Sequence, residues 1–97
     1  MALDKLAITM GKLGAGQWEL HLEDDERIDA FLDDVEVSEE RGFSAEGRNE
    51  EREMLYELTT GKQPGGPIRL RRRPIDGDEW EEVGEVVDAV KQDLAGQ

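Results

Sequence analysis

Residues 22–34, LEDDERIDAFLDD, set the predicted fold of this chain, because apolar side chains recur there and just beyond at steps of three and four. This spacing places side chains on one face of an α-helix. The apolar positions are Ile28, Phe31, Leu32 and Val35. Asp24 or Asp25 can cap the first turn. The pattern predicts a helix over residues 25–34, with one apolar face and one acidic face.

The acidic face of this segment is crowded, since residues 22–34 contain seven carboxylates and one arginine. On a helix Asp25, Asp29 and Asp33 share one side, and like charges four residues apart cost roughly 0.2–0.5 kcal/mol per pair. The helix dipole and capping explain acids in the first turn but not Asp33 or Asp34. We therefore expect the later acids to serve something other than fold stability.

Residues 78–94 repeat this arrangement near the carboxyl terminus. The apolar residues at steps of three and four are Trp80, Val83, Val87, Val90 and Leu94. The acids that lie away from this stripe are Asp78, Glu81, Glu82, Glu85 and Asp88. Gly96 follows the last turn, where glycine often ends a helix. The sequence predicts a second helix over 78–94 that covers a sheet.

Strands are predicted where apolar residues alternate with polar or small ones. Residues 5–10 and 17–22 show this alternation, and the glycine-rich GKLGAG between them predicts a β-hairpin. Residues 68–73 alternate in the same way and end at Pro74, which predicts another strand.

Residues 49–60 fit two structures. An asparagine that can cap the start and a glycine past the end favour a helix, and this interpretation is preferred. Alternating apolar residues from Met54 to Leu58 favour instead a strand over 53–60.

The predicted fold class is α+β. An antiparallel sheet of three to four strands packs against the two helices in a single domain over residues 1–97. Residues 36–48 are predicted to be mostly loop, with Phe43 as an anchor. The charged fraction is 38% and the formal net charge is −13, values that approach those of disordered chains. The periodic apolar patterns nevertheless indicate a folded domain.

Composition and motifs exclude several functions. The chain has no cysteine, which excludes disulfides, thiol catalysis and cysteine-ligated zinc. No segment approaches the roughly 18 apolar residues of a membrane span, so we expect a soluble, cytoplasmic protein without a membrane partner. GKLGAG does not match a phosphate-binding loop, and DGDEWEE does not match a calcium loop. With His21 as the single histidine, no nucleophilic triad can form. We expect no enzymatic activity, cofactor or metal.

The segment RLRRR, residues 69–73, is the exception to the acidic trend. On a strand Arg69, Arg71 and Arg73 point to one face and Arg72 to the other. Contact with nucleic acid is disfavoured, because a net charge of −13 repels phosphate. Arg69, Arg71 and Arg73 form an arginine row on one face of the strand, and we expect this row to pair with carboxylates of a neighbouring helix or loop. A contact with an acidic patch of a partner, or of another copy of the chain, is the alternative.

The acidic helix faces suggest a function. On a helix the charges of the first segment lie about 3 Å apart, a density similar to one phosphate per roughly 3.4 Å along a strand of B-DNA. In composition and size the chain resembles small acidic phage-encoded inhibitors of restriction or CRISPR machinery, although this resemblance covers no motif.

We therefore predict a non-enzymatic inhibitor that presents carboxylates to the positively charged nucleic-acid groove of a basic protein, without binding nucleic acid itself. The predicted partner-binding residues are Asp25, Asp29, Asp33, Asp34, Glu36, Glu81, Glu85 and Asp88. The alternative is a structural or adaptor subunit whose acidity reflects adaptation to high salt, which the excess of arginine over lysine also fits. The sequence leaves the oligomeric state open.

Overall fold

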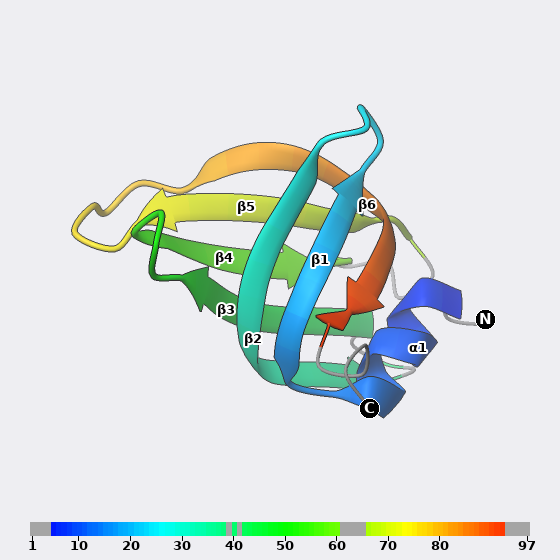
Figure 1. The fold of residues 1–97 in the computed structure, drawn as a ribbon. Helices are drawn as coiled ribbons and strands as arrows, with labels where there is room; N and C mark the ends of the chain where they lie inside the picture. Colours follow the sequence, from blue (N-terminus) through cyan, green and yellow to red (C-terminus); the bar gives the residue numbers. More distant parts are fainter. Residues whose placement is uncertain (1–4, 39, 41, 61–65, 93–97) are drawn as a thin grey trace.

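The computed structural model describes residues 5–38, 40, 42–60 and 66–92. In this part of the chain six antiparallel strands follow one another around a closed barrel, and the last pairs back with the first. One short helix lies at one end of the barrel (Figure 1). The elements are α1 (Lys5–Leu13), β1 (Gly16–Leu22), β2 (Arg27–Ser38), β3 (Gly42–Asn49), β4 (Met54–Thr59), β5 (Ile68–Pro74) and β6 (Glu81–Lys91). The predicted α+β class is therefore wrong, and the domain is mainly β.

The hydrophobic core fills the inside of the barrel. Successive side chains of a strand point to opposite faces, so alternate residues of each strand face inward. The buried apolar residues of the strands are Trp18, Leu20, Leu22, Ile28, Ala30, Leu32, Phe43, Ala45, Tyr56, Leu58, Ile68, Leu70 and Val86. Ala7 and Met10 of α1 belong to the same core, so the helix covers one end of the barrel.

Residues 5–10 form most of α1, so the predicted strand and the predicted hairpin over 5–22 are wrong. The buried face of the helix comes from Ala7 and Met10, which are three residues apart. The helix ends at Leu13. The next residue, Gly14, has a φ of 73°, and its N–H donates to the Met10 carbonyl at 2.8 Å. No helix in the described ranges has the length and apolar content to cross a membrane.

The predicted helix over 25–34 is wrong, because residues 27–34 form the start of β2 and residues 25 and 26 lie in the turn before it. Ile28, Ala30 and Leu32 are buried at steps of two. The register with β3 then shifts, because Leu32 pairs with Gly47 and Asp34 with Glu46, which leaves Asp33 as an extra residue in a bulge. Val35 therefore returns to the inner side three residues after Leu32. The bulge explains the step of three from Leu32 to Val35, whereas Phe31 of the predicted apolar face is exposed.

The predicted helix over 78–94 is wrong, because residues 81–91 form strand β6. Among the described residues of the predicted apolar stripe, only Val83 contacts the core. Relative to its neighbours β5 and β1, β6 has extra residues at Val83 and Val87. Val83, Val86 and Ala89 contact the core at steps of three, as the bulges require. Trp80, Val87 and Val90 of the predicted apolar stripe are exposed. Residues 93 and 94 of the predicted helix lie outside the described residues.

The strands predicted over 17–22 and 68–73 are confirmed as β1 and β5. Residues 54–59 form β4, so the strand interpretation of 53–60 is right and the preferred helix is wrong. The predicted loop over 36–48 is also wrong, since it holds the end of β2 and most of β3. Phe43 is fully buried, as an anchor should be.

Gly47 on β3 lies where β2 passes very close. A Cβ added at this position would lie 2.4 Å from the Phe31 carbonyl oxygen and 3.0 Å from the Leu32 Cα. Both contacts are with backbone of the paired strand, which cannot move without disturbing the ladder. Only glycine fits here without displacing β2.

We predict that Gly47→Ala lowers the free energy of unfolding by about 1–3 kcal/mol, because the new methyl group must push β2 away. Urea denaturation followed by tryptophan fluorescence measures this loss. Gly77→Ala is the matched control, since its Cβ would meet only the Pro74 ring at 3.3 Å in the β5–β6 turn. Equal losses in the two variants would contradict the close approach at β2.

Candidate functional site

The predicted partner-binding carboxylates lie on three parts of the barrel. Asp25 lies in the turn between β1 and β2 with a φ of 69°. The others follow β2 (Asp29, Asp33, Asp34 and Glu36) and β6 (Glu81, Glu85 and Asp88). Strand β1 lies between β2 and β6. The expected acidic plane on two helices is therefore wrong, because the helices do not exist and the residues are spread around the barrel.

The arginines of β5 bind carboxylates of both neighbouring strands. The ion pairs are Arg69–Glu82, Arg71–Glu57 and Arg72–Glu81. Arg69 Nε donates to Glu82 Oε1 at 2.7 Å, and Arg72 Nε lies 3.5 Å from Glu81 Oε2. The expected internal pairing is confirmed for Arg69 and Arg71 of the predicted row, although their partners lie on β6 and β4 instead of a helix or loop. Arg73 forms no ion pair within the described residues and instead packs on Trp80.

Trp80 packs on the same row. The guanidinium carbons of Arg71 and Arg73 each lie 5.3 Å from the centroid of the Trp80 ring. Such contacts contribute about 0.5–1 kcal/mol each at exposed sites. Trp80 therefore packs against charge instead of the core, and it remains 39% exposed.

Carboxylates gather on the outer side of β2, β3 and β4, and most of them lack an arginine partner within the described residues. This surface, called the acidic face from here on, consists of Asp34, Glu36, Glu46 and Glu57, which surround a hollow of about 250 Å³. Asp34 pairs directly with Glu46, and Glu46 pairs directly with Glu57. Glu57 binds Arg71, but the other three form no ion pair within the described part of the chain. Like charges at directly opposite positions destabilise a sheet.

Sequence reasoning found half of the acidic face. Asp34 and Glu36 were predicted as partner-binding residues, whereas Glu46 and Glu57 were missed. The signal for Glu46 was the alternation of the small inward residues Ala45 and Gly47 with polar ones along β3. Because such small residues hardly register as apolar, the segment looked like a loop.

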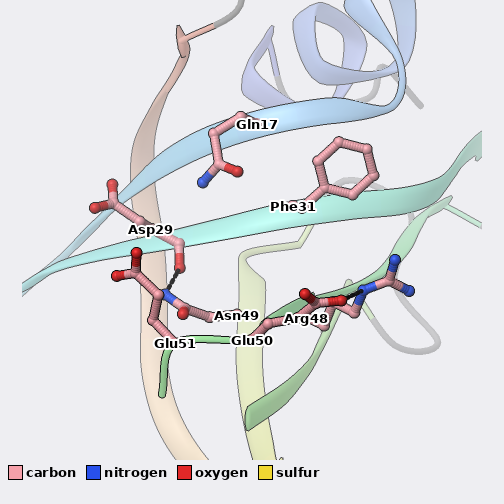
Figure 2. A pocket seen from close by; sticks show the side chains of 7 residues that line it. All are labelled: Gln17, Asp29, Phe31, Arg48, Asn49, Glu50 and Glu51. Atoms are coloured by element: carbon pink, nitrogen blue, oxygen red, sulfur yellow. Dashed lines mark hydrogen bonds and ion pairs between the residues drawn. The ribbon is translucent and has the colours of Figure 1, made fainter. Parts of the chain in front are cut away.

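A groove of about 490 Å³ adjoins the acidic face (Figure 2). Its lining residues are Gln17, Asp29, Phe31, Arg48, Asn49, Glu50 and Glu51, and we call it the Phe31 groove. Asn49 holds its wall in place, since its Nδ2 donates to the Asp29 carbonyl at 2.8 Å and its Oδ1 accepts from the Arg52 N–H at 3.1 Å. The β3–β4 turn is thereby fixed against β2.

Metal-ligating residues are sparse on this surface. His21 Nε2 lies 2.7 Å from Glu19 Oε1 on the outer side of β1. Within the described ranges no group of three or more histidine and carboxylate side chains could hold a metal ion.

Comparisons of the chain with family models, with curated proteins and with solved structures find no match. The function must therefore be argued from the surface itself.

Tyr56 of β4 lies inside the barrel. It pairs across the strands with Arg72 of β5, whose side chain leaves the strand on the face opposite to Arg71 and Arg73. Burial raises the pKa of the Tyr56 phenol above its usual value of 10.0, and the charges of Arg52 and Arg72 oppose this shift without cancelling it. A smaller contribution from Glu26 also raises the pKa. The folded barrel therefore favours the neutral phenol.

We predict that the folded protein titrates its single tyrosine above pH 10.0, because the charged form is disfavoured inside the barrel. The stabilisation from the neutral phenol is complete below this pH and is lost as the pH rises through the raised pKa. Absorbance of tyrosinate in native and urea-unfolded protein measures the two pKa values. Tyr56→Phe should weaken the alkaline loss of stability, and equal native and unfolded pKa values would contradict the argument.

Proposed function

We propose that the chain is a non-enzymatic interaction protein that presents the acidic face to a positively charged surface of a partner protein. The observation that carries this proposal is the direct cross-strand pairing of Asp34, Glu46 and Glu57. Within the described residues, only one of these three carboxylates has an arginine partner, namely Glu57, which binds Arg71. The repulsion costs fold stability, and a basic partner would relieve it.

A nucleic-acid-binding groove is the partner surface that fits this arrangement best. Adjacent strands lie about 4.8 Å apart, and residues on the same side of one strand lie about 6.8 Å apart. These spacings are of the same order as the charge spacing of B-DNA, in which one strand carries one phosphate per roughly 3.4 Å of helix axis. The protein would occupy the groove as a DNA mimic of the anti-CRISPR or anti-restriction type, and it would exclude nucleic acid sterically and by charge.

A second candidate is supported by the other carboxylates. Many of them lie in the turns at the end of the barrel away from α1, at residues 23–26, 50–53 and 76–79. Charges spread in this way hydrate a surface but do not define a binding face. They favour a structural or adaptor subunit of a complex whose surface is adapted to high salt.

We predict that the double variant Asp34→Lys, Glu46→Lys loses its basic partner. Each substitution replaces an attraction with a repulsion, so affinity should fall more than about tenfold. The measurement is capture of proteins from a nuclease-treated lysate of the source organism, followed by elution with salt. Duplex DNA should displace the captured partner from the wild-type protein.

The matched control is Asp76→Lys, Asp78→Lys, which makes the same change of charge in the β5–β6 turn. This variant should keep the partner. The proposal fails if both double variants retain the same proteins, or if the partner binds the domain and duplex DNA at the same time. Circular dichroism of each variant reports whether the barrel is intact.

The dependence of folding on salt separates the two candidates. If the acidic face serves a partner, potassium chloride should stabilise the fold only until screening is complete, since the Debye length falls to about 3 Å at 1 M. If the surface is adapted to high salt, the free energy of unfolding should continue to rise beyond this concentration. Urea denaturation at increasing potassium chloride measures this dependence, and a continued rise would favour the adaptor.

A further inference from the structure

The Phe31 groove and the acidic face share strands β2 and β3. Phe31 pairs with Arg48 of β3, and two residues away on that strand Glu46 pairs with Asp34. The outer surface of β2 and β3 therefore continues from the acidic face into the groove. A partner bound to the acidic face lies within reach of the groove.

Phe31 gives the groove an apolar wall. Its side chain is 42% exposed, whereas its neighbours Ala30 and Leu32 are 0% exposed. The alternation of β2 explains this contrast, because it directs the two neighbours into the core and Phe31 outward. An aromatic ring is thus available to a ligand in a concave site on a highly charged surface.

The carboxylates that line the groove favour a cation. Asp29 and Glu51 form no ion pair within the described ranges, and Figure 2 shows their carboxylates toward the side of the groove away from Arg48. Asp29 Oδ1 accepts a long hydrogen bond of 3.4 Å from the neutral amide of Gln92. This amide leaves the negative charge of the aspartate in place.

Arg48 does not cancel these two charges, because it is engaged elsewhere. Its Nη1 lies 3.3 Å from Asp33 Oδ2, and its Nε lies 3.2 Å from Glu50 Oε1. Two carboxylates thus share the one guanidinium. The groove keeps a net negative charge, and the carboxylates of Asp29 and Glu51 lie across it from the aromatic wall.

Arginine fits this combination better than the other side chains do. Its guanidinium is planar and weakly hydrated, stacks on aromatic rings and donates parallel hydrogen bonds to carboxylates. An apolar side chain would bury the carboxylates without a partner. A lysine ammonium is more strongly hydrated and lacks the flat surface.

We propose that the Phe31 groove binds an arginine side chain of the basic partner, stacked on Phe31 and hydrogen-bonded to Asp29 and Glu51. This inference rests on the proposed function, since it names the side chain that the partner inserts beside the acidic face. The acidic face would supply attraction at a distance. The groove would supply a preference among basic sequences.

The test uses hexa-arginine and hexa-lysine peptides, which have the same length and charge, titrated at low salt by isothermal calorimetry. Phe31→Leu keeps an apolar wall but removes the aromatic ring, so it should weaken hexa-arginine about two- to fivefold and leave hexa-lysine unchanged. Val87→Ala, at an exposed apolar position on β6, is the matched control and should change neither affinity. The double variant Asp29→Asn, Glu51→Gln should weaken hexa-arginine more than Asp76→Asn, Glu79→Gln does.

The possible outcomes separate this inference from the proposed function. If Phe31→Leu affects both peptides equally or affects neither, the groove does not select arginine and the inference is overturned. If the groove double variant weakens hexa-arginine no more than its control, the inference is also overturned. The proposed function fails separately if Asp34→Lys, Glu46→Lys leaves the affinity for both peptides unchanged.

Discussion

The pairing of β6 with β1 closes the barrel, and the rest of the structure depends on this contact. A closed barrel has a single interior, so each strand must supply apolar side chains at its inward positions. The chain has few apolar residues beyond those that the interior needs, since 36% of its residues are hydrophobic. Long strands must also bend around so small a barrel, and bulges allow this because they increase the local twist and bend of a strand. The bulges of β2 and β6 are therefore part of the closure, and α1 completes the core by covering one end with Ala7 and Met10.

Closure also determines which charges meet on the outside. Strand β5 lies between β4 and β6, so its arginines reach carboxylates on both sides. On the β4 side, the arginines of β5 reach no further than Glu57, which binds Arg71. On the next two strands Glu46 and Asp34 face each other without an arginine opposite them. One side of the barrel is thus electrostatically paired, and the neighbouring side carries the excess of negative charge that makes it a candidate for binding.

Strands whose apolar residues alternate regularly could be predicted from the sequence, whereas irregular strands could not. Strands β1 and β5 were predictable because their apolar residues alternate without an extra residue. In β2 and β6 the bulges break the alternation of inward residues, and exposed apolar residues such as Phe31, Val87 and Val90 complete a helix-like pattern. Strand β3 was missed because Ala45 and Gly47, its small inward residues, give almost no apolar signal. The pairing of the arginine row was predictable from net charge, whereas the acidic face depends on strand register, which no local pattern encodes.

Closure has one more consequence, for the manner of recognition. Every strand of the described barrel has a hydrogen-bonded neighbour on both sides, so it offers no free edge. Proteins that recognise peptides by β-augmentation use such an edge, and main-chain hydrogen bonds then supply affinity that depends little on sequence. The described strands of this barrel therefore cannot bind a peptide by β-augmentation. Whatever binds its wall must be held by side chains, so a few substitutions on either surface can change the choice of partner while the scaffold stays the same.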